Sequence, residues 1–466
     1  MIINHYNRFD KESIIQHARG LLNRSIGDFL DESERNVLTG KGRLGQLVEA
    51  KYFKYKVNSS TNADFHEVGM ELKCSPLKVG KNGFVSKERL VLNIINYLDV
   101  VDEKFDKSSF MKKNADLLLM FYLHEKDKHF IDYIFKLIGN WVFPDNDLQI
   151  IRKDWEFIVD KIRLGKAHEL SEGDTFYLGA CTKGTSAKTV RKQPFNSVLA
   201  KQRAFSLKQG YVNQIIVKLF EEQGIYIGKP LQRLVDSKQD LKRYSLDEII
   251  VSKFEKYYNK TISDIISENR IDVNYLSKSF TAVLTKILLG IELDKEIEEL
   301  TKAGVKVKTI RLGQDNVPKE HLSFPAFNFI DLVNDDWEDS AFKSQLETKF
   351  LFVFLKYNEK EELYFEKVKF WNMNAADINK CRIVWKKTQK VVLDGNIVHE
   401  VSASGRRSTN FPSTKDNSVA HVRPHATSSK DTYPLPVQDR HTGQYEYTKH
   451  SFWLNKEFIK NKIYEL

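Results

Sequence analysis

A short segment of the chain, residues 62–76, holds two carboxylates and an amine at a spacing that suits phosphodiester chemistry. Glu71 and Lys73 lie two residues apart, and they share one face of a strand because side chains alternate along it. Asp64 comes seven residues before Glu71, and a bend at Gly69 can return its carboxylate to the same place. The spacing therefore predicts a turn that feeds a short strand, which ends near the proline that closes the segment.

Three such groups could carry out metal-dependent hydrolysis. Carboxylate oxygens are the ligands that Mg²⁺ prefers, and bound Mg²⁺ stabilises charge on a phosphate and lowers the pKa of a bound water. Asp64 and Glu71 are therefore the expected Mg²⁺ ligands. Lys73 could orient or deprotonate the attacking water, or offset the charge that builds on the phosphate. The same triplet also occurs on exposed strand faces without any chemistry, so the spacing alone leaves a solvated strand face as an alternative.

The order of the motifs resembles the MutH and Sau-type endonucleases, which act at GATC in DNA. The pattern G-x-L-G-Q-L-x-E at residues 42–49 is followed by D-F-x-E-x-G-x-E-L-K at residues 64–73, and D-x6-E-x-K is the signature of PD-(D/E)XK nucleases. Further matching segments are residues 86–97, 153–155, 165–170 and 200–208. The resemblance spans most of residues 35–215 and implies an α/β fold, in which a mixed sheet is flanked by helices.

The resemblance also implies two further members of the site. Residues 42–53 have helical periodicity, and Glu49 lies at the edge of their apolar stripe, where the resemblance makes it an auxiliary carboxylate. A second lysine of the MutH site falls near Lys113, in a short basic turn before an apolar strand. A solvated turn lysine is the alternative interpretation of Lys113.

The charge of the chain favours a polyanionic partner such as DNA. Its 466 residues predict two or three domains, and the net charge is +10. No acidic residue lies between Asp174 and Glu221, and this interval supplies most of the basic excess. The basic residues of the interval are Lys183, Lys188, Arg191, Lys192, Lys201, Arg203, Lys208 and Lys218. A basic surface that is merely solvated is the alternative.

The resemblance places a DNA-reading loop within this basic interval. Residues 175–178 are predicted to form a strand that leads into a loop over residues 181–192. This loop is small, polar and basic, which suits an approach to base edges and phosphates. By position, Thr182 and Lys183 are the base-reading candidates, although MutH has an arginine where Thr182 stands. The further DNA contacts that we expect are Lys188, Arg191, Ser206 and Lys208.

The remaining features fit a protein of the cytoplasm with no membrane partner. The three cysteines are widely separated and support neither a disulfide framework nor a zinc site. The N-terminus has no apolar signal core, and the longest hydrophobic runs, residues 117–123 and 350–355, are too short to span a bilayer. They are predicted to be buried strands. Trp155, on a predicted amphipathic helix over residues 148–166, is expected to anchor the core rather than stack on a base.

The later half of the chain repeats the first. Gly69 corresponds to Gly304 and Phe110 to Phe342, and the separations of all matched positions lie between 230 (155 to 385) and 247 (205 to 452) residues. The further matched pairs are Trp155 with Trp385, Thr182 with Arg423, and Phe205 with Phe452. The repeat predicts a catalytic domain over residues 1–225, a helical connector over 226–290, and a second MutH-like domain over 291–466.

The second copy is predicted not to cut DNA. Glu299 stands at the position of Asp64, and Lys306 stands at the position of Glu71, where an ammonium would oppose cation binding. The copy keeps a basic loop with Arg423 and His425, and a guanidinium can make a bidentate contact to guanine. The two basic residues expected on a preceding flexible arm are Arg406 and Arg407. Plain surface charges are the alternative for all of these arginines.

The resemblance thus implies a Mg²⁺-dependent type II restriction endonuclease that cuts double-stranded DNA at GATC, 5′ of the guanine. It also implies that the second copy binds another site as an effector. We expect a chain that is monomeric when free and pairs on DNA, with a cognate methyltransferase in the host. The alternatives are a MutH-like nicking endonuclease of repair, against which the duplication counts, and a non-catalytic DNA-binding protein on a nuclease fold.

Overall fold

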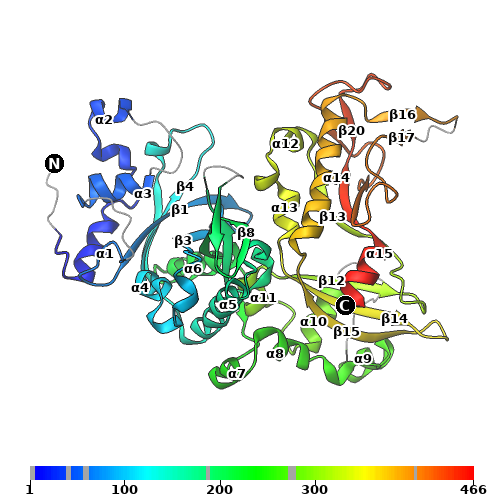
Figure 1. Ribbon diagram of the computed structural model, residues 1–466, viewed down its shortest axis with the longest axis horizontal. Helices are drawn as coiled ribbons and strands as arrows, with labels where there is room; N and C mark the ends of the chain where they lie inside the picture. The colour runs from blue at the N-terminus through cyan, green and yellow to red at the C-terminus, as the bar shows by residue number, and fades with distance from the viewer. Residues whose placement is uncertain are drawn as a thin grey trace. The chain divides into compact units, whose positions relative to one another are not determined.

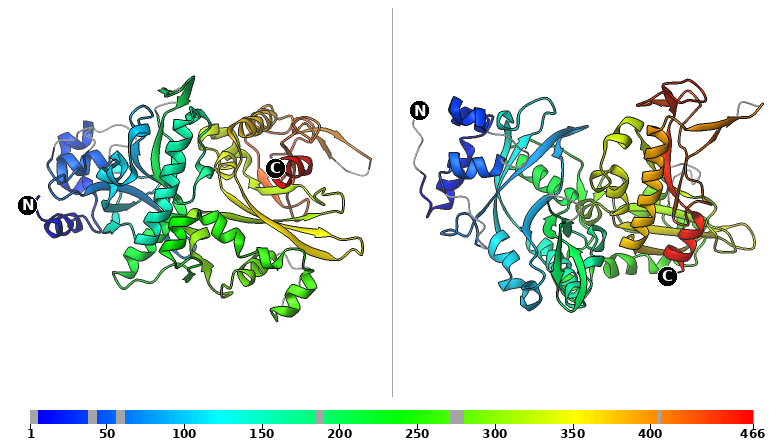
Figure 2. Two further views of the ribbon diagram at one scale, coloured as in Figure 1. Left: turned by 60° about the horizontal axis from the view of Figure 1, so that its bottom comes forward. Right: turned by 45° about the horizontal axis from the view of Figure 1, so that its top comes forward.

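The chain forms two compact units (Figures 1 and 2). The computed structural model describes residues 6–37, 44–55, 62–184, 189–270, 280–403 and 407–465. The first unit comprises residues 1–170, 174–249 and 291–304, and the second comprises residues 171–173, 250–290 and 305–466. The stretch predicted as a connector, residues 226–290, is divided between the two units after residue 249.

The first unit is built on a four-stranded sheet in the order β2-β1-β4-β5 and a three-stranded sheet in the order β3-β9-β6. Its helices are α1 (Lys11–Arg19), α2 (Glu32–Val37), α3 (Leu44–Leu47), α4 (Ser109–Asn114), α5 (Asp145–Arg163), α6 (Gln209–Glu221), α7 (Lys238–Arg243) and α11 (Glu298–Ala303). Its strands are β1 (Glu71–Gly80), β2 (Gly83–Ser86), β3 (Leu90–Ile94), β4 (Asp116–Leu123), β5 (Phe135–Val142), β6 (Leu178–Thr182), β7 (Val190–Gln193), β8 (Asn196–Lys201), β9 (Arg203–Leu207), β10 (Leu231–Gln232) and β11 (Glu296–Ile297). The helix α8 (Leu246–Ser252) crosses the boundary between the units.

The four-stranded sheet carries the predicted catalytic strand at its centre. β1 pairs in parallel with β4 and antiparallel with β2, and β5 pairs antiparallel with β4. One face of this sheet, which includes Leu72, Leu118 and Met120, packs on Ile14 and Ala18 of α1. Figure 2 shows the blue helices α1 to α3 gathered beside that sheet. Glu71 and Lys73 belong to the opposite face, because side chains alternate along β1.

The predicted helix around Trp155 is confirmed as α5, and Trp155 is a core residue. Its side chain is 1% exposed and packs edge to face on Phe105, with 5.7 Å between the ring centroids. Burial of so large an aromatic side chain contributes several kcal/mol to the stability of a fold. The predicted buried strands are confirmed as β4 in the first unit and β14 (Phe350–Tyr357) in the second.

The second unit repeats this arrangement with a three-stranded sheet in the order β12-β14-β15 and another in the order β13-β21-β18. Its helices are α9 (Ile262–Glu268), α10 (Phe280–Leu288), α12 (Phe329–Asn334), α13 (Ala341–Leu346), α14 (Ala375–Leu393) and α15 (Lys456–Ile459). Its other strands are β12 (Lys306–Leu312), β13 (Leu322–Phe327), β15 (Leu363–Trp371), β16 (Val398–Val401), β17 (Arg407–Thr409), β18 (Ala420–Pro424), β19 (Thr432–Pro434), β20 (Glu446–Thr448) and β21 (His450–Leu454). Figure 1 shows the long helix α14 running along the second of these sheets.

Strand register shows the duplication residue by residue. In the first unit Glu71 is paired with Leu117, and Leu117 is paired with Trp141. In the second unit Lys306 is paired with Phe350, and Phe350 is paired with Trp371. The helices before the central strands also match, because Ser108 caps α4 and Ser340 caps α13.

Three local expectations were wrong, each for a structural reason. The strand expected to end near Pro76 runs on to Gly80, because residues from Leu77 onward pair with β2. The strand expected over residues 175–178 begins only at Leu178, because the buried Asp154 carboxylate accepts the backbone N–H groups of Phe176, Tyr177 and Leu178. The polar loop expected over residues 181–192 ends in a hairpin of β7 and β8.

Two buried histidines make the second unit sensitive to acid. Burial lowers the pKa of both His421 and His450 to about 4, whereas an unfolded histidine has a pKa of about 6.5. The unfolded state therefore binds more protons below pH 6.5, and the free energy of unfolding falls as the pH drops from that value toward 4.

Between pH 7 and pH 5 we expect a loss of about 2 kcal/mol for each histidine. Urea titrations at the two pH values measure this loss of stability. His450→Asn is the comparison, because the variant lacks one of the two histidines. The variant should show a smaller loss on acidification than the wild type. An equal loss in both proteins would contradict this origin of acid sensitivity.

Two other expectations concern the whole chain. Within the described residues, no helix is both long enough and apolar enough to cross a membrane. Cys74, Cys181 and Cys381 are free thiols.

Candidate active site

The predicted turn delivers Asp64 to the start of β1. Phe65 and Met70 form an isolated bridge that closes the turn, and Gly69 adopts a φ of 70°, which favours glycine. The backbone N–H of Leu72 donates to Oδ2 of Asp64 at 3.1 Å, and the backbone N–H of Asp64 donates to Oε2 of Glu71 at 3.1 Å. The turn therefore fixes one carboxylate beside the other.

Two lysines converge on the Glu71 carboxylate. Lys73 Nζ donates to Glu71 Oε1 at 2.6 Å, and Lys113 Nζ lies 3.5 Å from the same oxygen. Lys113 is in the last turn of α4, whose first turn is capped by Ser108. Helix α4 and strand β1 thus bring together four residues that the sequence predicted as one site, namely Asp64, Glu71, Lys73 and Lys113.

Glu49 approaches the same cluster from a π-helical turn, residues 48–52, that continues α3. Such turns are uncommon and occur frequently at functional sites. Burial raises the pKa of Glu49 to about 7, with the Asp64 and Glu71 carboxylates adding to the increase. Burial and the Glu71 charge likewise raise the pKa of Asp64 to about 6. Three carboxylates therefore repel one another in a partly desolvated place.

The donor set fits a small hard cation. Burial is the main reason why the pKa values of Glu49 and Asp64 are raised, and the charges of the neighbouring carboxylates add to the increase. A cation beside these carboxylates would relieve that repulsion. Among the described residues, no three His, Cys, Asp or Glu side chains converge closely enough to form a complete cage. Mg²⁺ does not need one, since it is usually bound by one or two carboxylates together with waters and substrate phosphates.

Sequence reasoning missed Tyr55. Its hydroxyl group is buried with no hydrogen-bond partner in the described part of the chain. Burial raises its pKa well above the usual value, with contributions from Asp64, Glu49 and Glu71. A buried phenol without a hydrogen-bond partner beside carboxylates requires an explanation, and it makes Tyr55 a candidate member of the site. The spacing of Tyr55 after Glu49 gave no signal, because aromatic residues at such positions are usually core.

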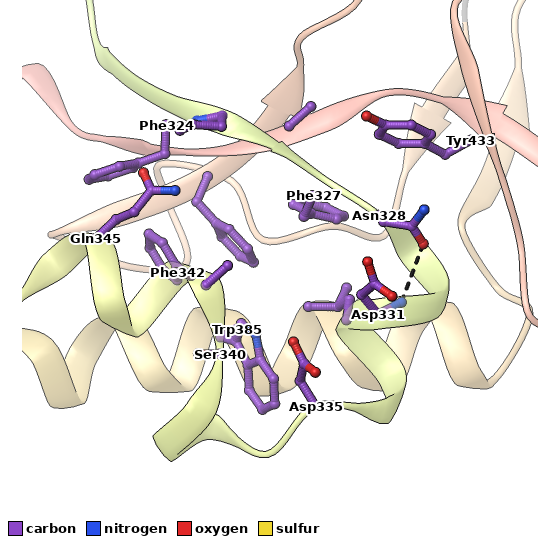
Figure 3. A pocket seen from close by; sticks show the side chains of 15 residues that line it. Phe324, Phe327, Asn328, Asp331, Asp335, Ser340, Phe342, Gln345, Trp385 and Tyr433 are labelled. Atoms are coloured by element: carbon purple, nitrogen blue, oxygen red, sulfur yellow. Dashed lines mark hydrogen bonds between the residues drawn. The ribbon is translucent and has the colours of Figure 1, made fainter. Parts of the chain in front are cut away.

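A cavity of about 410 Å³ opens beside Lys113 in the first unit, between β3 and α4. The second unit has the matching cavity, of about 600 Å³, between β13, α12 and α13 (Figure 3). The two linings correspond position by position, for example Asn96 with Asn328 and Lys113 with Gln345. Figure 3 shows Gln345 at the edge of the aromatic lining, so the second cavity lacks the ammonium of the first.

The second unit lacks the carboxylate pair at the equivalent strand. Lys306 and Lys308 of β12 take the register of Glu71 and Lys73. Glu299, which the sequence placed opposite Asp64, is in α11, and its carboxylate accepts the backbone N–H groups of Leu234 and Val235. That carboxylate is therefore occupied within the first unit.

The DNA-reading candidates of the first unit are only partly brought together. Lys183 is exposed just beyond the end of β6, Thr182 is half-buried at that end, and Arg191 is exposed on β7. The backbone N–H of Lys183 donates to the carbonyl of Gln202 at 2.9 Å, which leaves its side chain to solvent. Lys188 lies outside the described residues.

Two other candidates are covered by protein. Ser206 is 1% exposed on the central strand β9, between β3 and β6. Lys208 is half-buried, and its ammonium donates to the carbonyl of Thr175. A contact from Ser206 to DNA would require that position to become uncovered, and a contact from Lys208 would require its ammonium to leave the carbonyl of Thr175.

The basic segment of the second unit is a strand rather than the expected loop. Arg423 and His425 are exposed at the end of β18, and Trp453 of β21 lies beside both. Strand register shows that Arg423 corresponds to Cys181 and not, as the sequence predicted, to Thr182. Arg423 pairs with Ser451 of β21, as Cys181 pairs with Ala204 of β9. Arg407 is exposed at the start of β17, whereas Arg406 lies outside the described residues.

Comparisons with known proteins agree with this geometry. The family described as DNA mismatch repair enzyme MutH matches residues 53–154 and again residues 289–393. The type II restriction enzyme Sau3AI of Staphylococcus aureus is 34% identical, with 98% of this chain and 99% of that protein covered. The DNA mismatch repair protein MutH of Shewanella woodyi is 25% identical over 46% of this chain and 93% of its own length. That of Buchnera aphidicola is 26% identical over 35% of this chain and 75% of its own length.

The fold and the site thus define a mixed α/β nuclease of the MutH class that is present twice in one polypeptide, as the sequence predicted. The first copy has the charged cluster, and the second has lysines at the equivalent strand positions. The near full-length match to a restriction enzyme separates this chain from the single-copy repair proteins. The chain belongs to the family of type II restriction enzymes that includes Sau3AI.

Proposed function

We propose that this protein is a Mg²⁺-dependent restriction endonuclease that cuts both strands of DNA at GATC, 5′ of the guanine. The observation that carries the proposal is the convergence of Asp64, Glu71, Lys73 and Lys113 in a chain that matches Sau3AI over nearly its full length. Family membership supports a divalent-metal nuclease acting on DNA. The choice of Mg²⁺ and of GATC comes from the likeness to the MutH and Sau-type enzymes.

The residues of the first unit have separate tasks in this proposal. Asp64 and Glu71 hold Mg²⁺, which when bound stabilises the charge on the phosphate and lowers the pKa of water. Lys73 is positioned by its hydrogen bond to Glu71, from where its ammonium can orient the attacking water or offset charge on a phosphate oxygen. Lys113 supplies a second positive charge near the same carboxylate oxygen. Glu49 is the auxiliary carboxylate.

The second unit binds a further site on DNA as an effector and does not cut. The ammonium of Lys306 replaces a metal ligand at the equivalent strand position, and like charge opposes cation binding there. A palindromic site has two equivalent scissile bonds, so a double-strand cut requires two catalytic units on the DNA. We therefore propose that chains that are monomeric in solution pair on the site. We expect this activity in the cytoplasm of a host whose own DNA is protected by a cognate methyltransferase.

Digestion of a sequenced plasmid tests this function directly. We expect Mg²⁺ to give linear fragments whose 5′ ends map to the guanine of each GATC, and a chelator to stop the reaction. Accumulation of open-circular plasmid alone would instead favour a nicking endonuclease. An intact plasmid under all conditions would favour a DNA-binding protein without catalysis.

Lys183→Ala tests the DNA-reading segment. Its exposed ammonium lies just beyond β6, so we expect weaker binding to a GATC duplex. If Lys183 contacts a phosphate, the slope of log affinity against log salt becomes shallower by about 0.9. If it contacts a base, the preference for GATC over a scrambled duplex falls by about 1–3 kcal/mol. Fluorescence anisotropy at several salt concentrations distinguishes these cases, and unchanged binding would remove Lys183 from the interface.

A further inference from the structure

The second unit places two lysines where the first places Glu71 and Lys73. Lys306 pairs with the first residue of β14, as Glu71 pairs with Leu117 of β4. Lys308 follows two residues later, so its side chain lies on the same face of the strand. The strand position that carries a negative charge in the cutting unit therefore carries a positive charge here.

The two lysines lie two positions apart on one face of β12, and neither forms an ion pair within the described part of the chain. Lys306 is exposed and Lys308 is half-buried, and the pKa of Lys308 is lowered by burial and by the charge of Lys306. Across the described ranges, no carboxylate forms an ion pair with either group, whereas Lys343 of the same unit contacts both Glu338 and Glu347. Two uncompensated like charges on one face favour an anion between them.

A further lysine lies on the same face of this sheet, two strands away from β12 and beyond the buried Phe352. Lys308 is paired with Phe352 of β14, and Phe352 is paired with Lys369 of β15, so the three side chains share a face. In the first unit the residue in the register of Lys369 is Gly139. The equivalent faces of the two units thus differ by more than the loss of a carboxylate, because the second unit has Lys369 where the first has Gly139.

We propose that Lys306 and Lys308 bind a phosphodiester group of the DNA backbone directly, at the place where the cutting unit uses a cation. The proposal rests on the proposed function, since DNA is the ligand. Its consequence is that the second unit holds DNA in the absence of a divalent cation. In the first unit, by contrast, Asp64 and Glu71 repel a phosphate unless a cation lies between them.

The chemistry of Lys306 and Lys308 suits a phosphodiester ligand. A lysine ammonium is a compact charge with three donors that binds phosphate oxygens with charge-assisted hydrogen bonds. The strand holds the backbone of both residues in fixed register, so both side chains extend from the same face of β12. Neither group can act as a metal ligand while protonated, which explains how this unit can bind a DNA backbone and leave it intact.

Binding of the full chain to a fluorescent duplex with two GATC sites, measured in chelator over a range of salt concentrations, tests the proposal. We expect Lys306→Ala/Lys308→Ala to lower the affinity about tenfold and to make the salt slope shallower by about 1–2, because contacts to phosphate are lost. Lys306→Glu should weaken binding in chelator further, because it places a carboxylate against the phosphate. Thermal melting of each variant verifies that the fold is retained.

The matched control is Lys386→Ala/Lys390→Ala, which removes the same charge from exposed positions of α14. The equivalent positions of α5 in the cutting unit are acidic, Glu156 and Asp160, so this helix face is not expected to meet DNA. The control should retain the affinity and salt slope of the wild type. Equal behaviour of the β12 variant and the control would overturn the proposal.

Failure of this inference can be told apart from failure of the proposed function. Plasmid cleavage by the wild-type chain reports on the first unit and uses no variant of β12. A wild type that cuts at GATC, combined with a β12 variant that binds normally in chelator, would refute only the phosphate contact. A wild type that neither cuts nor binds GATC would refute the function on which the contact rests.

Discussion

Replacement of Asp64 or Glu71 by alanine is expected to reduce cleavage at GATC by on the order of 10³-fold or more, since each variant loses several kcal/mol of transition-state charge stabilisation. Asp64 accepts the backbone N–H of Leu72, and Glu71 accepts Lys73, so both carboxylates are held in place rather than free to rearrange. Neither belongs to the basic interval between residues 174 and 221. Single-turnover cleavage of a GATC duplex measures the loss.

DNA affinity should survive these substitutions. Without a divalent cation, removal of a carboxylate relieves repulsion of the phosphate, so binding should be unchanged or tighter. Glu88→Ala is the matched control, because Glu88 is an exposed acid of the same unit and should leave cleavage intact. Normal cleavage by either the Asp64 or the Glu71 variant would contradict the assignment of the metal ligands.

Replacement of Lys73 by alanine should lower the cleavage rate by on the order of 10²–10⁴-fold with little effect on binding, the range typical of lost general acid–base or electrostatic catalysis. Its ammonium lies 2.6 Å from Glu71, within the cluster itself. Lys73→Arg should restore little, because the planar guanidinium cannot replace a compact ammonium in a half-buried site.

The control for Lys73 lies on the same strand. Lys78 is exposed on the opposite face of β1, five residues further along, so Lys78→Ala changes the same charge outside the cluster. It should cleave at the wild-type rate. Equal losses in the two variants would show that the charge of the strand matters, and not the position of Lys73.

Structural features that depend on residues close together in the sequence were predicted well. The period of two in β1 is a local property, so the shared face of Glu71 and Lys73 followed from spacing alone. The bend at Gly69 was likewise predicted, and the structure shows it as a left-handed residue, a conformation that glycine favours. The duplication was predicted too, since glycine and aromatic positions recur at similar separations along the chain.

Tertiary contacts were harder to predict. No local pattern indicates that Asp154 accepts three backbone N–H groups and so delays the start of β6. The burial of Ser206 depends on its two neighbouring strands, which are distant in sequence. Strand register also shifted the residue of the first unit that is equivalent to Arg423 by one position. Loops of unequal length hide such shifts from a sequence comparison.

The central claim is that a divalent cation binds between Asp64 and Glu71 of the first unit and that β12 of the second unit has no such role. Electron paramagnetic resonance titration of the full chain with Mn²⁺, in complex with a GATC duplex, measures it. We expect Asp64→Ala/Glu71→Ala to lose tight Mn²⁺ binding and Lys306→Ala/Lys308→Ala to retain it. Full Mn²⁺ binding by the first variant would contradict the claim.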